Sequence, residues 1–294
     1  MKRYMCVLVL ILTAGALSAE KPAAKEYAIR YHRPYAAGER FTMSVTDHER
    51  SEMNIGTPEK TVQNQQEDTT VRFNVLCTVQ EITPKGHIRK ASYAVDLFSV
   101  ESGGGSEEVL ARGKVILAVL QNKSGEFTVD GAPADDRLKK FLERVLPGND
   151  DNESDEAVFG SAVKRKPGDC WPINAERAAE EFKNEKVTFD KKSISGQMCL
   201  ESSAMVDGAE CLNMKGFMNV GEMKYPGVDI KIDKSEARME VSGVFPVDEK
   251  KKCLSSTMTM SMSFAASGKF QPELPEMKII ASFTREKQTK YVPK

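Results

Sequence analysis

The side chains best suited to binding a ligand are methionines near the C-terminus. Met258, Met260 and Met262 alternate with serine and threonine, and in a β-strand such residues lie on one face. Thioether sulfur is a soft ligand that suits Cu(I), but methionine also fills irregular apolar cores. Because no histidine accompanies the stripe, we favour a half-buried strand face, which can also accept an adaptable apolar ligand. Copper binding through the three methionines is kept as an alternative.

Residues with the spacing of known catalytic motifs are scarce. The histidines His32, His48 and His87 form no HExxH or related arrangement. Ser161 and Lys164 have the SxxK spacing of the penicillin-recognising enzymes, whose lysine activates the serine from the same helical turn. A proline–glycine pair follows closely and disfavours a long helix there. We expect a non-catalytic protein without a cofactor, and a hydrolase of unknown type is the second alternative.

The first 19 residues have the composition of a secretory signal peptide. Lys2 and Arg3 precede the apolar run 6–12, and Ala16–Ala19 supplies the small residues that a signal peptidase reads. The apolar run is too short to span a bilayer. We predict cleavage near Ala19 and an extracytoplasmic location, either periplasmic or secreted.

Composition argues against two classes of partner. No later apolar run approaches the roughly 20 residues of a membrane helix, so no transmembrane anchor is expected in the mature chain. The longest run, Val115–Leu120, is typical of a buried strand. The 42 basic and 43 acidic residues lack the concentrated basic footprint of a nucleic-acid binder. The partner that we expect is an apolar ligand or an envelope protein.

Five cysteines follow the predicted signal peptide, and secretion permits disulfides between them. Their odd number leaves at least one cysteine unpaired. No two have the CxxC spacing, which argues against a local zinc site or a thioredoxin-like redox site. The sequence leaves the pairing open among Cys77, Cys170, Cys199, Cys211 and Cys253.

Most of the chain has the period-two alternation of antiparallel strands. The alternation is strict in Phe41–Val45, continues in Val71–Val79 and Ala91–Leu97, and returns in Ile279–Phe283. Such alternation places one side of a strand on a core and the other toward water. We therefore predict a mainly β fold of antiparallel sheet with one or two short packed helices.

One amphipathic helix is predicted at 136–146, after the N-cap candidate Asp135. Its apolar stripe should pack into the concave side of the sheet with its side chains buried. In that position Leu138, Phe141 and Leu142 are candidate ligand contacts.

An acidic, turn-rich stretch at 149–156 divides the chain. We predict an N-terminal β-rich half over 20–148, an acidic linker over 149–165 and a C-terminal β-rich half over 166–294. A weaker helix over 175–182 has a narrow apolar face and is expected to lie on the surface of the second half.

The only tryptophan lies in Lys166-Pro167-Gly168-Asp169-Cys170-Trp171, before the second predicted helix and a hairpin turn at Val206-Asp207-Gly208. This layout resembles secreted bacterial domains of unknown function, in which a "pGDxW" turn opens the C-terminal half of a β-rich fold. Such domains are similar in outline to the periplasmic lipoprotein-carrier half-barrels, a curved antiparallel sheet around helices that is open to an apolar ligand. The resemblance implies this outline here, and Trp171 is a further candidate ligand contact; no catalytic residue comes with it.

Overall fold

The structure is a computed structural model that describes residues 25–57, 60–121, 124–146, 154–182, 188–221, 223–224, 230–268 and 276–294. The predicted signal peptide (1–19) lies outside these residues. The most acidic part of the predicted linker (149–153) lies outside them as well.

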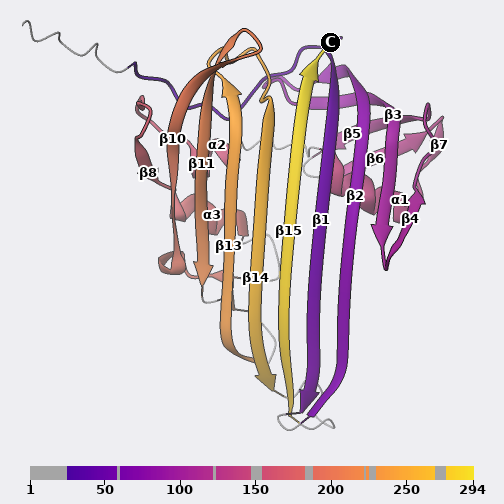
Figure 1. The fold of residues 1–294 in the computed structure, drawn as a ribbon, viewed down its shortest axis with the longest axis vertical. Helices are drawn as coiled ribbons and strands as arrows, with labels where there is room; N and C mark the ends of the chain where they lie inside the picture. Colours follow the sequence, from indigo (N-terminus) through magenta and orange to yellow (C-terminus); the bar gives the residue numbers. More distant parts are fainter. Residues whose placement is uncertain are drawn as a thin grey trace, which may run out of the picture.

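An antiparallel sheet of 13 strands dominates the described chain (Figure 1). Its strands are β1 (Arg40–Thr57), β2 (Lys60–Ile82), β3 (Ile88–Ser102), β4 (Gly105–Glu108), β5 (Val115–Gln121), β6 (Ser124–Val129), β7 (Ala132–Pro133), β8 (Cys170–Pro172), β10 (Ile194–Val206), β11 (Ala209–Gly221), β13 (Ile230–Pro246), β14 (Ser255–Gly268) and β15 (Met277–Pro293). Two short strands, β9 (Thr188–Phe189) and β12 (Met223–Lys224), pair separately. The α-helices are α1 (Asp136–Val145), α2 (Ser154–Phe159) and α3 (Ala175–Phe182), and a 3₁₀ turn covers Lys191–Ser193.

The sheet runs through both halves of the sequence. Its strand order is β7-β6-β5-β3-β2-β1-β15-β14-β13-β11-β10-β8, with β4 beside β3. The halves join where the first long strand, β1, pairs with the last, β15, from Phe41 opposite Pro293 to Gly56 opposite Lys278. Within the described residues the two ends of this order do not pair, so the sheet is open. The predicted mainly β, half-barrel-like fold is confirmed.

All three α-helices lie on one face of the sheet, which we call the inner face (Figure 1). Strand alternation decides which side chains share it. In β1, Phe41, Met43 and Val45 are buried on this face, whereas Thr42 and Ser44 between them are only half-buried.

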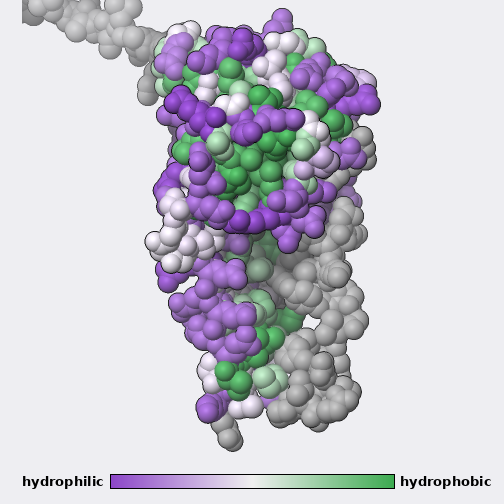
Figure 2. Space-filling view, turned by 90° about the vertical axis from the view of Figure 1, so that its right-hand side faces the viewer, coloured by the Kyte–Doolittle hydropathy of each residue, from purple (hydrophilic) through white to green (hydrophobic). Residues whose placement is uncertain are grey.

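The first hydrophobic core lies between α1 and the strands β1, β2, β3, β5 and β6. Its largest buried side chains are Phe41, Phe73, Tyr93 and Phe98, and the rings of Phe73 and Phe98 meet edge to face with centroids 4.8 Å apart. Seen from the side of β4 and β7, hydrophobic residues gather in the upper half of the molecule within a rim of hydrophilic residues (Figure 2).

Helix α1 begins as predicted, because the Asp135 carboxylate accepts a hydrogen bond from the backbone N–H of Leu138. Leu142 and Val145 are buried in the first core. Leu138 and Phe141 are only half-buried against it, which differs from the expected full burial. Leu138 lies in the first helical turn, whose other residues are exposed, and Phe141 lies at the flank of the stripe.

The second hydrophobic core lies between α2, α3 and the strands β8, β10 and β11. An extended N-terminal segment completes it with the buried Tyr27 and Ile29, and Tyr27 pairs with Arg165 through two backbone hydrogen bonds of 2.8 Å. Helix α2 lies within the range predicted as a linker, yet Val158 and Phe159 are buried in this core. Part of that range is therefore packed structure.

Helix α3 coincides with the second predicted helix but packs more closely than a surface position implies. Ala178 and Ala179 are buried in the second core, because small side chains let the helix backbone approach its neighbours. None of the helices in the described ranges combines the length and the apolar composition needed to cross a membrane.

One disulfide resolves part of the cysteine pairing that the sequence left open. Cys170 of β8 is bonded to Cys199 of β10, and the two residues are direct partners in the strand register. Cys77, Cys211 and Cys253 are free thiols. The bond holds the short edge strand β8, with its tryptophan, against the second core.

Candidate functional site

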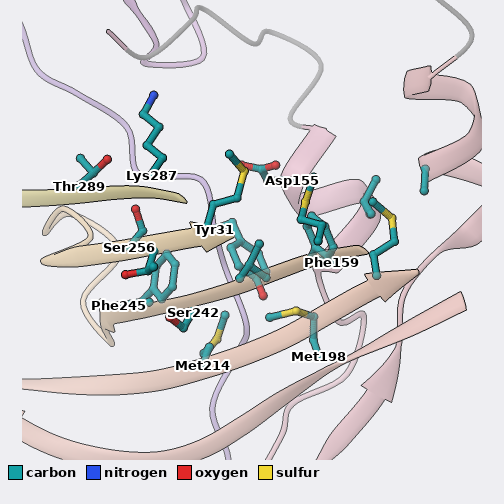
Figure 3. A pocket seen from close by; sticks show the side chains of 18 of the residues that line it. Tyr31, Asp155, Phe159, Met198, Met214, Ser242, Phe245, Ser256, Lys287 and Thr289 are labelled. Atoms are coloured by element: carbon teal, nitrogen blue, oxygen red, sulfur yellow. The ribbon is translucent and has the colours of Figure 1, made fainter. Parts of the chain in front are cut away.

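A pocket of about 450 Å³ opens on the inner face, where the second core meets the central strands. Residues of β10, β11, β13 and β14 line it from the sheet, residues of α2 and α3 line it from the helices, and Tyr31 closes one side (Figure 3). This volume and an apolar lining are typical of small-molecule sites. Five methionines line this pocket, which we call the methionine pocket: Met198, Met214, Met218, Met239 and Met258.

Strand register brings these methionines together from four strands. Met239 of β13 lies opposite Met218 of β11 and, on its other side, opposite Met260 of β14. Directly opposed side chains in a sheet are about 5 Å apart at Cβ. A Cβ at Gly216 would lie 1.9 Å from the sulfur of Met198, so glycine lets that thioether lie flat on β11. Flexible thioethers therefore form much of the pocket floor.

Tyr31 belongs to the N-terminal segment and is part of the pocket wall. Its ring meets Phe245 edge to face with centroids 5.4 Å apart, and its backbone N–H donates to Glu156 of α2 at 2.6 Å. The Tyr31 hydroxyl is buried without a hydrogen-bond partner among the described residues. Burial raises the pKa of this phenol, so it stays protonated at neutral pH.

One end of the pocket is polar. Lys287 and Thr289 of β15 and Ser256 of β14 lie together there, across from Met198 and Phe159 (Figure 3). The Lys287 ammonium donates to the carbonyl oxygen of Arg144, in the last turn of α1, at 2.7 Å. Burial lowers the pKa of Lys287 to about 8, and the neighbouring Arg285 acts in the same direction.

A cluster of charged side chains lies beside the polar end, between the two cores. Asp47 is fully buried, and its carboxylate accepts hydrogen bonds from Arg285 at 2.5 to 3.1 Å and from Arg144 at 3.1 Å. Burial acts to raise the pKa of Asp47, but the two guanidinium groups outweigh it and hold the pKa below its usual value. Arg144 also lies 3.3 Å from Glu49.

The sequence-predicted ligand contacts do not lie together. Leu138, Phe141 and Leu142 belong to α1 and the first core, and Phe141 also lines a separate hollow among charged residues of α1. Trp171 is buried in the second core, where its indole N–H donates to the Phe159 carbonyl at 3.0 Å. None of the four is among the residues that line the methionine pocket, and their role in ligand binding stays a prediction.

The methionine stripe was correctly expected to share one face. Met258, Met260 and Met262 lie opposite Val241, Met239 and Ala237 in strict alternation, and all three are half-buried. Met258 lines the methionine pocket, whereas Met262 lines a second pocket nearer the far end of the strands. The other methionines could be noticed in the sequence because they share the same half of the chain, but their register partners could not be read from it.

The local geometry gives little support to the catalytic and metal-binding alternatives. Ser161 and Lys164 lie in a non-helical bend, not on one helical turn, and the Ser161 hydroxyl is hydrogen-bonded to the Val163 carbonyl and the Arg165 side chain. No cluster of three or more His, Cys, Asp or Glu side chains that could hold a metal ion was found in the described part of the chain.

Comparison with known proteins gives no family. No family model matches the chain, and no curated protein matches it. Solved structures with some likeness include lipovitellin (7% identity, TM-score 0.34, 88% of this chain covered). They also include an outer membrane channel from Pseudomonas putida F1 (9%, 0.21, 88% of this chain and 97% of the channel) and Pseudomonas aeruginosa OpdQ (7%, 0.19, 86% and 98%). The chain spans about a quarter of the lipovitellin chain that it matches. At these TM-scores the likeness carries no inference about function.

Proposed function

We propose that the protein is an extracytoplasmic, envelope-associated binding protein that holds an apolar ligand in the methionine pocket. The observation that carries this proposal is the pocket itself, about 450 Å³ of space whose lining includes five methionines and three aromatic rings. A well-packed core leaves few voids larger than a water molecule. Space of this size with an apolar lining offers room for an occupant, and flexible methionines suit ligands of variable shape.

The position of the pocket supports binding rather than a packing defect. The inner-face residues of β14 and β15 between the two cores are almost all half-buried, so within the described residues the central strands form a floor beside the pocket that no helix covers. A ligand can enter along this floor without displacing a helix. The N-terminal composition typical of a signal peptide and the Cys170–Cys199 disulfide support the extracytoplasmic location.

Copper binding is the second candidate, because five thioethers line one pocket and Cu(I) prefers such ligands. The positions of the three methionines on β14 argue against copper binding by that stripe. Met258 and Met262 are four residues apart on one strand, which separates their Cα atoms by about 13 Å, and they line different pockets. The three methionines of the stripe therefore do not converge on one ion.

Native mass spectrometry of protein purified from its own host tests the proposal. We expect a retained apolar molecule in the wild type and its loss in Met258→Trp, whose indole fills the pocket from a half-buried position. Met262→Trp is the matched control, since it lies on the same strand and face but outside the pocket. A retained copper ion in place of an organic mass would support the second candidate. Wild type without any retained mass that also fails to bind a long-chain alcohol in solution would contradict the proposal.

A further inference from the structure

We propose that the ligand of the methionine pocket is a single-chain amphiphile with an anionic head group, bound with its head at Lys287 and its chain among the methionines. This inference rests on the proposed function and specifies the class of ligand. It is carried by the size of the pocket, its division into a polar and an apolar end, and the charges around the polar end.

The size of the pocket limits the ligand to one chain. A cavity of about 150 Å³ holds benzene, with its six carbons. By that scale, the 450 Å³ of the pocket corresponds to about 18 non-hydrogen atoms. This is the size of one long acyl chain with a small head, and it is too small for a lipid with two such chains.

The two ends of the pocket differ in chemistry. Ser256, Thr289 and Lys287 supply two hydroxyls and an ammonium at one end (Figure 3). Met198, Met218 and Phe159 line the other end and offer apolar contacts to an alkyl chain, while Asp155 and Glu181 add carboxylates to the lining from the helices. An apolar ligand without a head would leave the two hydroxyls and the lysine of the polar end without a polar partner on the ligand, which is unfavourable in a partly buried site. A ligand that is amphiphilic matches both ends.

The charges beside the polar end favour an anion over a cation or a neutral head. Arg285 and Arg144 both hold the Asp47 carboxylate, and Arg144 also pairs with Glu49. These two guanidiniums are thus matched by two carboxylates, which leaves Lys287 as the further cation of the polar end. Asp155 and Glu181 add two carboxylates to the pocket lining from the helices, but the charges that act on the pKa of Lys287 are those of Arg285, Asp47 and Arg144. Among the described residues, the Lys287 ammonium donates to the neutral Arg144 carbonyl. A carboxylate or a phosphate monoester on the ligand would balance that charge.

Isothermal titration calorimetry with three twelve-carbon amphiphiles tests this inference. The three are dodecanoate, dodecanol and dodecyltrimethylammonium, each used below the concentration at which it forms micelles or separates from solution. We expect dodecanoate to bind best and the trimethylammonium compound to bind worst. Dodecyl phosphate separates the two anionic sources: tighter binding than dodecanoate points to a phosphorylated lipid, and weaker binding points to a free fatty acid. If dodecanol binds as well as dodecanoate, the head-group inference fails while the apolar pocket stands. If none of them binds, both proposals fail.

Charge-removing variants locate the head group. Lys287→Gln keeps a donor for the Arg144 carbonyl but loses the charge, and we expect dodecanoate binding to weaken about tenfold to a hundredfold, as for lost hydrogen bonds to charged groups. Dodecanol binding should change little. Lys290→Gln is the control, because Lys290 is an exposed lysine on the outer face of the same strand. Equal dodecanoate affinity in wild type and Lys287→Gln, with both folded by circular dichroism, would overturn the assignment.

Discussion

At the scale of single residues, Lys287 is the group that decides how the pocket responds to pH. Its pKa of about 8 means that the ammonium is present below pH 8 and is lost above it. The charges that act on its pKa are Arg285 on its own strand, Asp47 on β1 and Arg144 on α1. Asp155 and Glu181 line the same pocket from α2 and α3. A dodecanoate carboxylate is ionised throughout the neutral and alkaline range.

We therefore expect dodecanoate affinity to fall as the pH rises through about 8, while dodecanol affinity stays constant. At pH 8 to 9, binding should take up protons, because an anion beside Lys287 favours its charged form. Isothermal titration calorimetry in two buffers of different ionisation enthalpy measures that proton uptake. A pH profile that is the same in wild type and Lys287→Gln would show that another group is responsible.

Asp47 is the residue on which the charged cluster depends. Replacing it with asparagine leaves Arg285 partly buried without its matching charge and leaves Arg144 paired only with Glu49, so Asp47→Asn should lower the free energy of unfolding by about 3–5 kcal/mol. Asp68→Asn is the control. It removes an exposed carboxylate that pairs with His48 on the surface, and should cost at most about 1 kcal/mol. Urea unfolding at pH 7 measures both.

The Asp47 carboxylate also makes the stability of the folded protein depend on pH in a definite direction. Because the pKa of Asp47 is lower in the folded state than its unfolded value of 3.8, its contribution is present above about pH 4 and is lost as the pH falls below that value. The stability of Asp47→Asn should therefore fall less steeply between about pH 4 and pH 2 than that of the wild type. Parallel acid profiles would mean that Asp47 is not held ionised.

Tyr31 offers a test of the pocket wall that does not involve a ligand. Its buried hydroxyl has no partner in the described structure, so Tyr31→Phe should raise the free energy of unfolding by about 1 kcal/mol. Tyr27→Phe should lower it by a similar amount, because the Tyr27 hydroxyl is hydrogen-bonded to Ser203 and Glu210. A loss of stability in Tyr31→Phe would reveal a partner for its hydroxyl.

At the scale of elements, the strands that the sequence predicted are those with apolar alternation. The segments around Val45, Val75 and Val95 lie on the first core, where alternation is a direct consequence of burial. The far ends of β1 and β2 were not predicted because they are polar: residues 60–68 of β2 are all exposed. They are strands because each pairs along its length with a neighbour, and backbone pairing leaves little trace in side-chain types.

Helix α2 shows a second reason why an element can be missed when only the sequence is known. Its surroundings are strongly acidic, and only two of its residues, Val158 and Phe159, are buried. A six-residue helix is far below the length that is stable alone, so its formation depends on the second core. Such a helix has no periodic signature of its own, whereas the cap and the stripe of α1 made that helix predictable.

The disulfide is the element-scale feature that is easiest to test. Cys170 and Cys199 close a loop with a sequence separation of 29, for which the chain-entropy model gives about 3–4 kcal/mol. The double variant Cys170→Ser with Cys199→Ser should be less stable than the oxidised wild type by about that amount, and dithiothreitol should destabilise only the wild type. An equal effect of reductant on both would show that the bond lies between other cysteines.

At the scale of the whole molecule, the pairing of the first long strand with the last explains why the site could not be assembled from the sequence. The polar end of the pocket comes from β14 and β15, and the charges beside it from β1 and α1. Residues 47, 144 and 287 are adjacent only because β1 pairs with β15 and α1 lies over both. Local patterns identified the methionines but not the charges, since charged residues in strands usually face solvent.

The location of the molecule is a separate prediction. We expect the mature N-terminus at Glu20 or within a few residues of it, in an extracytoplasmic fraction. N-terminal sequencing of protein from its own host measures this directly. Full-length protein that retains Met1 in the cytoplasm would contradict the localisation and remove the oxidising compartment that the disulfide requires.

The central claim is that an anionic, single-chain amphiphile occupies the methionine pocket in a fixed orientation. A crystal structure with dodecanoate carrying a terminal bromine tests it most directly, because the anomalous signal of bromine locates the chain end. We predict a bromine peak among Met198, Met214 and Met218, with the carboxylate beside Lys287. A bromine peak beside Phe141 on α1 or on the outer face of the sheet, or a pocket without ligand density at saturating concentration, would contradict the claim.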